Sequence, residues 1–148
     1  MLQLIYGALM AGHKAANAAA TWPTINGSWI PDTMFTHQPF LLNFIDNTIL
    51  IHFIHRGLAY IILGLLIYWS LQLFKLSATP ILSKAAKYPL IMVIVQVILG
   101  IASVLTSSSI VPGSWGGFEW MAQLHQLTGM LLLLSLVTIL FLVRPKIC

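Results

Sequence analysis

Two histidines lie within long apolar stretches of the sequence, where ionisable side chains are rare. His55 is in the run 49–74, and His125 is in the run 120–143. An ionisable residue inside a membrane span is energetically costly, and it therefore marks a candidate functional site. Both histidines stand about two helical turns from the start of their runs. We therefore expect the two imidazoles to lie at similar depth and to converge on one metal ion.

Two facing imidazoles are suited to hold a haem iron, because each neutral ring has one nitrogen free for the metal. Ligation on both sides of the iron favours electron transfer or a structural role over oxygen binding. Arg56 follows His55 directly, and its guanidinium can donate two hydrogen bonds to a haem propionate. His52 lies three residues before His55, hence on the same helix face, so we expect it at the edge of the haem or a substrate.

Structural roles are the alternative for these histidines. Hydrogen bonds between helices would explain His55 and His125 without a metal, and His52 would then be an interfacial residue. Glu119 most simply stabilises the N-terminus of the last helix, with proton handling near His125 as its alternative role. A zinc site is disfavoured because a closed site needs four ligands and the spans offer at most three histidines. A continuous pore is disfavoured because the polar groups gather in one half of the helices.

The composition places the chain in a membrane. Of 148 residues, 59% are hydrophobic and 7% are charged, and the mean hydropathy is +0.93. Soluble domains carry about 25% charged residues, so a water-soluble globule is excluded. The seven Lys and Arg residues form no basic patch, which excludes nucleic-acid binding despite the net charge of +4. Cys148 is the one cysteine, so the chain forms no internal disulfide.

The apolar runs predict an all-α integral membrane protein with one domain over residues 1–148. A span needs about 20 apolar residues. We expect four helices, over about 1–20, 49–74, 84–106 and 119–143. Residues 21–48 are expected to form a loop on the outer face. The first run contains His13 and Lys14, and its apolar part is too short to cross alone. We expect it to be the outer half of a spanning helix whose beginning is absent, since no basic region precedes it as in a signal peptide.

The cations predict the orientation of these helices. Positive charges are retained on the cytoplasmic side of bacterial membranes or on the matrix side of the mitochondrial inner membrane. Five of the seven cations lie in two places. Lys75, Lys84 and Lys87 flank the loop between the second and third helices, and Arg144 and Lys146 follow the fourth helix. The loop 75–87 and the C-terminus are therefore expected on the cytoplasmic or matrix side. The aromatic-rich loop 21–48 is expected at the outer interface.

A short internal repeat relates the two halves of the chain. The segment QLIYG at residues 3–7 matches QVILG at residues 96–100, and the helix that follows each segment carries one of the two histidines. The pattern predicts two related helical hairpins in a four-helix bundle, with His55 and His125 in equivalent positions about a pseudo-twofold axis. Gln3 and Gln96, which begin the repeated segments, are interpreted as residues that form hydrogen bonds between packed helices.

The motifs, taken in order, resemble the C-terminal half of haem A synthase. They are GALMAG (7–12), TWP (21–23), GSWIP (27–31), FIHR (53–56) and LHQ (124–126). That family has eight transmembrane helices in two similar halves, and it oxidises a methyl group of haem O to the formyl group of haem A for cytochrome oxidase. The resemblance implies that His55 and His125 are the axial ligands of haem b.

The resemblance also implies that this chain is half of an eight-helix functional unit. The family's other half has its own histidine pair, with a glutamate three residues before the first histidine. His52 stands at the matching position here, so no catalytic residue is assigned. We expect either a fragment or a half-length protein that pairs with a second copy, and haem b binding without turnover in the lone chain. Further expected partners are haem O, haem O synthase and an electron donor. The alternative function is a non-catalytic membrane b-type cytochrome or haem carrier.

Overall fold

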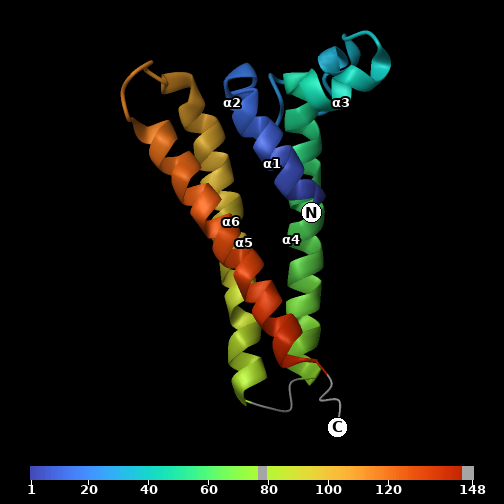
Figure 1. The fold of residues 1–148 in the computed structure, drawn as a ribbon, viewed down its shortest axis with the longest axis vertical. Coiled ribbons are helices and arrows are strands. Elements are labelled where there is room, and N and C mark those ends of the chain that lie inside the picture. The colour runs from blue at the N-terminus through green and yellow to red at the C-terminus, as the bar shows by residue number, and fades with distance from the viewer. Residues whose placement is uncertain (77–79, 145–148) are drawn as a thin grey trace.

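The computed structural model describes residues 1–76 and 80–144 of the chain (Figure 1). Three long helices dominate it, with short elements at one end. In chain order the elements are α1 (Leu2–Gly12), α2 (Ala15–Ala18), η1 (Asp32–Phe35), η2 (Phe40–Leu42), α3 (Asn43–Asp46), α4 (Thr48–Leu76), α5 (Pro80–Thr106), η3 (Ser107–Ser109) and α6 (Gly117–Leu142). No named strand occurs within the described residues.

Three helices are long and apolar enough to cross a membrane. The apolar spans are Thr48–Lys75, Lys84–Ser109 and Gly117–Leu142, of 28, 26 and 26 residues. Large apolar side chains remain exposed along them, among them Leu131, Leu134 and Phe141. A hydrocarbon solvent covers such surfaces at no cost, whereas water does not. The chain is therefore an all-helical, multi-pass membrane protein, and the three long helices predicted from the sequence are present.

The predicted continuous helix over residues 1–20 is wrong. α1 ends at Gly12 after 11 residues, and Lys14 adopts a left-handed conformation with φ of 50° before α2 begins. A left-handed residue cannot continue a right-handed helix. An 11-residue helix is about 16 Å long, which is roughly half of a hydrocarbon core of about 30 Å. The described residues thus contain three span-length helices, and the short α1 lies beside the upper part of α4 (Figure 1).

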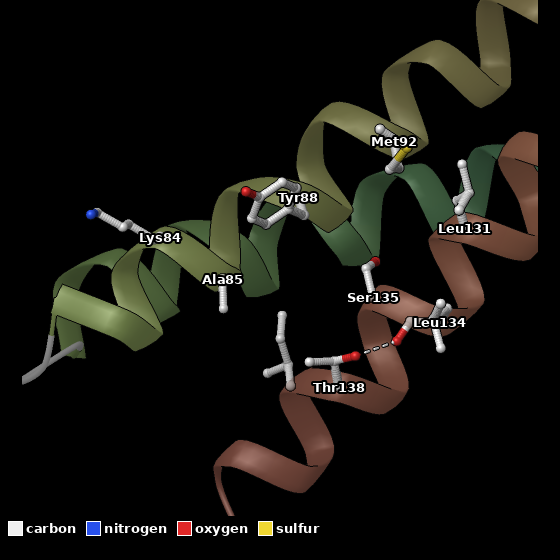
Figure 2. Close-up of a pocket in the computed structure, with 9 residues that line it drawn as sticks. Lys84, Ala85, Tyr88, Met92, Leu131, Leu134, Ser135 and Thr138 are labelled. Carbon is white, nitrogen blue, oxygen red and sulfur yellow. Dashed lines mark hydrogen bonds between the residues drawn. The ribbon is translucent and has the colours of Figure 1, made fainter.

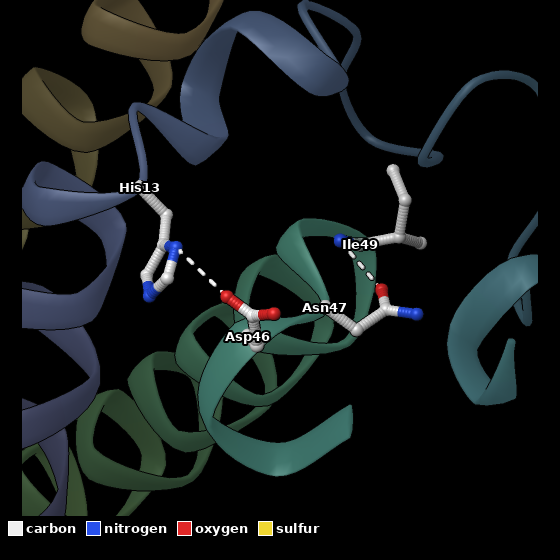
Figure 3. A network of polar contacts seen from close by, with 4 residues as sticks. All are labelled: His13, Asp46, Asn47 and Ile49. Atoms are coloured by element: carbon white, nitrogen blue, oxygen red, sulfur yellow. Dashed lines mark hydrogen bonds and ion pairs between the residues drawn. The ribbon is translucent and has the colours of Figure 1, made fainter. Parts of the chain in front are cut away.

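The predicted outer loop folds into a packed segment over the start of α4. Asn47 is buried, and its Oδ1 accepts a hydrogen bond from the backbone N–H group of Ile49 at 3.0 Å (Figure 3). It accepts a second one from the backbone N–H group of Leu50 at 3.1 Å. This arrangement is an N-cap. Its Nδ2 donates to the Thr33 carbonyl at 2.9 Å, and Asn43 holds the backbone of His37 in the same way. These two asparagines fix the loop to the helix that carries His55.

The helices pair in sequence order. α1 packs on α4, α4 packs on α5, and α5 and α6 pack side by side. The buried side chains are few and include Ile51, Val93 and Ile139. The predicted loop 75–87 is wrong in its bounds, because α4 extends to Leu76 and α5 begins at Pro80, which places Lys84 and Lys87 in the first turns of α5.

Four of the six cationic residues that the structure describes lie at one end of the molecule, and Lys14 and Arg56 lie near the other. Lys75 lies in the last turn of α4, Lys84 and Lys87 lie near the start of α5, and Arg144 follows α6, all at the lower end of the three long helices in Figure 1. Lys146 and Cys148 lie outside the described residues. This gathering of cations at the end opposite to the packed loop agrees with one orientation for all the helices. The assignment of that end to the cytoplasm or matrix stays a prediction.

Candidate functional site

The structure brings His55 of α4 and His125 of α6 together. Their ring centroids are 6.5 Å apart, and the ring planes make an angle of 71°. Both side chains are half-buried. The two residues are far apart in the sequence, so their meeting is a property of the helix packing. Their role as metal ligands stays a prediction.

A glutamine from the neighbouring helix contacts each imidazole. Gln3 Nε2 in α1 lies 3.4 Å from His55 Nε2, and Gln96 Nε2 in α5 lies 3.3 Å from His125 Nε2. These glutamines begin the two repeated segments. The repeat therefore corresponds to the same contact made twice, once within each pair of helices. Sequence reasoning placed these glutamines between helices but did not identify the histidines as their partners.

Two glycines, again at matching positions of the repeat, let the imidazoles lie against a helix backbone. A Cβ atom at Gly7 would be 3.5 Å from His55 Cε1, and a Cβ atom at Gly100 would be 3.0 Å from His125 Cε1. The second distance is tighter than nine in ten real Cβ contacts, so a side chain at position 100 would require the His125 ring to move by a few tenths of an ångström. This function of the glycines was not predicted from the sequence. The signal for it was that both repeated segments end in glycine.

The two histidines differ at their second ring nitrogen. His125 Nδ1 lies 3.0 Å from the backbone carbonyl of Gln96. A carbonyl only accepts, so Nδ1 carries the hydrogen and Nε2 of the neutral ring keeps a free lone pair. His55 Nδ1 is buried, and it has no hydrogen-bond partner among the described residues. His125 is thus fixed at both nitrogens, whereas His55 is held at one.

Arg56 and His52 face the outer segment. Arg56 Nε donates to His52 Nε2 at 3.0 Å, and His52 is completely buried. The remaining guanidinium N–H groups lie at 2.6 to 3.5 Å from four backbone carbonyls, those of Ala19, Thr21, Pro23 and Thr24. Arg56 therefore ties the segment 19–24 to α4. Its predicted contact with a propionate, and the predicted place of His52 at a haem or substrate edge, stay predictions.

Other polar residues singled out in the sequence have partners away from the histidine pair. Glu119 Oε2 accepts a hydrogen bond from the Gly116 N–H at 2.8 Å and so caps the N-terminus of α6. This is the stabilising role that the sequence predicted for Glu119. His13 Nδ1 lies 3.6 Å from Asp46 Oδ1 at the packed outer loop (Figure 3).

One open hollow of about 500 Å³ lies between α5 and α6, and Figure 2 shows residues that line it. Its walls are mostly apolar, with Lys84 at one end and Met92 toward the other. None of the four predicted site residues lines it. The histidine pair is therefore a separate feature of the molecule.

The fold and the paired histidines define a helical membrane protein with two equivalent imidazole sites on successive helix pairs. The sequence matches the COX15-CtaA family of cytochrome oxidase assembly proteins over residues 1–137. The chain belongs to this family, which confirms the family resemblance of its motifs.

Curated relatives of the chain are haem A synthases. The protein of Beijerinckia indica is 38% identical over 138 residues, which cover 90% of this chain and 35% of the relative. That of Bradyrhizobium sp. (strain ORS 278) is 34% identical over 134 residues, 89% of this chain and 34% of the relative. The protein of Bartonella henselae is 33% identical over 105 residues, which cover 71% of this chain and 29% of the relative. The chain thus spans about a third of the length of these relatives. No solved structure matches it.

Proposed function

We propose that this chain is the haem b-binding part of a haem A synthase, with His55 and His125 as the axial ligands. The observation that carries the proposal is the 6.5 Å separation of the two ring centroids. Metal–imidazole bonds are about 2 Å long, so two rings on one metal have their centres roughly 6 Å apart. The observed separation fits this requirement, and the glycines at positions 7 and 100 leave space beside both rings.

The residues around the pair are suited to hold such a group. The hydrogen bond from His125 Nδ1 to the Gln96 carbonyl fixes the ring tautomer and leaves Nε2 for a metal. His55 enters from α4 with its Nε2 near Gln3. The two histidines lie on apolar, span-length helices, and the polarity around a haem is one of the factors that set its reduction potential. When bound, haem b supplies one-electron transfer during the oxidation of the haem O methyl group to the formyl group of haem A.

The complete reaction needs more than this chain, in our proposal. His52 occupies the position at which the family's other half has a glutamate, and its Nε2 is already bonded to Arg56. Catalytic residues therefore remain unassigned here. The expected partners are haem O, an electron donor, haem O synthase, and either a second half of the synthase or a second copy of this chain. The host membrane is proposed to be a bacterial cell membrane or the mitochondrial inner membrane.

The experiment that tests the ligand pair is spectroscopic. The chain is purified in detergent micelles and reconstituted with haem b, and its visible absorption spectrum is compared with those of His55→Ala and His125→Ala. We expect a low-spin spectrum for the unchanged chain and its loss in both variants. His13→Ala is the matched control, because His13 pairs with Asp46 at the outer loop. An unchanged spectrum in either test variant would remove that histidine from the ligand pair.

The alternative function is a non-catalytic membrane b-type cytochrome or haem carrier. Its support is the histidine at position 52 in place of a carboxylate. The two functions share a haem spectrum but differ in turnover. Conversion of haem O to haem A by this chain with the remaining half of the synthase and an electron donor would favour the synthase. Haem binding without conversion in that mixture would favour the cytochrome or carrier.

A further inference from the structure

Gln3 and Gln96 each contact Nε2 of one histidine of the pair. Their side-chain amides lie 3.4 Å and 3.3 Å from Nε2 of His55 and His125. The direction of the second contact is fixed, because His125 Nδ1 carries the hydrogen that faces the Gln96 carbonyl. Nε2 is then an acceptor, and the Gln96 amide donates to it. The lone pair that would bind iron is therefore the one that the glutamine uses.

Both amides leave their other end unsatisfied. Gln3 Oε1 and Gln96 Oε1 are buried, and neither has a hydrogen-bond partner among the described residues. A buried acceptor without a partner is unfavourable, and its occurrence at both repeated positions is unusual for a native structure. The contacts at 3.3–3.4 Å are also long for hydrogen bonds. Each amide is thus held weakly enough to be displaced.

A further glycine reserves space for one of the amides. A Cβ atom at Gly129 in α6 would lie 3.1 Å from Gln96 Nε2. The absence of a side chain at Gly129 therefore leaves room for the Gln96 amide beside His125, which lies four residues before Gly129 on α6. Such a close fit is expected for a defined resting position of the Gln96 side chain.

We propose that Gln3 and Gln96 are gating residues of the histidine pair. Each amide occupies Nε2 of its histidine in the haem-free chain and moves away when iron binds there. This inference rests on the proposed haem-binding function and deepens it. The gates hold the rings in place in the haem-free chain, and they lower the affinity for haem because two contacts must be broken before ligation.

The test is a haem b titration of the chain in detergent micelles. Gln96→Leu and Gln3→Leu remove the amide at similar side-chain size, and Gln96→Ala and Gln3→Ala remove it while leaving space. We expect each variant to bind haem b about three-fold more tightly than the unchanged chain, and the double variants about ten-fold. Gln123→Leu is the matched control, because Gln123 is exposed on α6 two residues before His125, and its affinity should not change.

Two outcomes would overturn the gating role. One is haem binding that is no tighter than that of the unchanged chain in both the Leu and the Ala variants, measured on variants that remain monodisperse in detergent. The other comes from nitrogen NMR of the haem-free chain: we expect Nδ1 of His125 protonated and Nε2 unprotonated, with Nε2 shifted in Gln96→Ala. A hydrogen on Nε2 in the unchanged chain would reverse the contact. Failure of the unchanged chain to bind haem b in low-spin form would instead refute the proposed function, whatever the NMR result.

Discussion

The two histidine sites share one plan but differ in how firmly they hold the ring. His125 is bonded at both nitrogens and lies against Gly100 so closely that a Cβ there would be 3.0 Å away. His55 is contacted at Nε2, its Nδ1 has no partner in the described part of the chain, and the corresponding distance at Gly7 is 3.5 Å. The two repeated segments therefore share the glutamine contact at histidine Nε2. Among the residues that the structure describes, the backbone contact at Nδ1 is made only to His125.

This difference assigns different tasks to the two rings. A hydrogen bond at the second nitrogen orients a ligating imidazole and increases its basicity. His125, between two full-length helices, is therefore the pre-oriented ligand of the pair. His55 faces the short α1 of 11 residues and has more freedom to adjust its ring plane. We expect one fixed and one adaptable ligand to accept a rigid planar cofactor more readily than two fixed ones would.

Removal of each histidine gives the largest predicted effect and the most direct test of this asymmetry. We expect His125→Ala to lower the affinity for haem b at least ten-fold more than His55→Ala does, because loss of an orienting partner alone costs about 10–100-fold at metal sites. After His55→Ala, the fixed His125 still offers one oriented ligand. Haem titrations of the two variants provide the measurement. Equal losses would show that the contact at Nδ1 does not distinguish the sites.

The glycines provide a matched pair with a smaller effect. Gly100→Ala forces the His125 ring to shift, since the added Cβ would lie 3.0 Å from Cε1, whereas Gly7→Ala makes an ordinary contact at 3.5 Å. We expect about a ten-fold loss of haem affinity in the first variant and less than a two-fold change in the second. Both substitutions favour the helix, so a change in helicity cannot mimic the difference. A comparable loss in both variants would contradict the proposed difference in packing.

Much of the fold and part of the site could be predicted from the sequence. The three long helices follow from the length of their apolar runs, because a membrane span has few other solutions. The repeat placed Gln3 and Gln96 at equivalent positions. The places of His55 and His125 in their apolar runs predicted similar depth and convergence of the rings, whose centroids are 6.5 Å apart. Each of these inferences depends on local composition or on a match between segments. Neither kind of information requires the tertiary structure.

The remainder depends on contacts between distant segments. The break at Lys14 is a single left-handed backbone conformation, and the polar residues His13 and Lys14 interrupt the apolar run without indicating that conformation. The partners of Arg56 are carbonyls of the segment 19–24, which folds back onto α4 by way of the buried Asn43 and Asn47. Neither a periodicity nor a motif indicates which carbonyls a guanidinium will meet. That His55 Nδ1 has no hydrogen-bond partner in the part of the chain that the structure describes is likewise visible only in three dimensions.

Arg56 tests whether the His55 side depends on the outer segment. Arg56→Ala removes hydrogen bonds from a charged donor to the carbonyls of Thr21 and Thr24, at 2.6 and 3.1 Å. We expect a loss of about 2 kcal/mol in the free energy of unfolding and faster proteolysis within residues 19–24. Thermal unfolding in detergent and mass mapping of the cleavage sites measure these effects. A fall in haem affinity with an unchanged rate of cleavage would instead support the predicted contact with a propionate.

The helix caps give the smallest effects and compare the starts of the two histidine-bearing helices. Asn47 caps α4 with two accepted hydrogen bonds from within a buried site, whereas Glu119 accepts one from Gly116 at the start of α6. We expect Asn47→Ala to lower the free energy of unfolding by about 1–2 kcal/mol and Glu119→Ala by about 0.5 kcal/mol. Glu119→Gln keeps an acceptor and should be nearly neutral in thermal unfolding. If Glu119→Gln also leaves turnover of the assembled synthase unchanged, the carboxylate acts only as a cap. A slower turnover at unchanged stability would favour proton handling, and it would make the His125 side the chemically more active of the two.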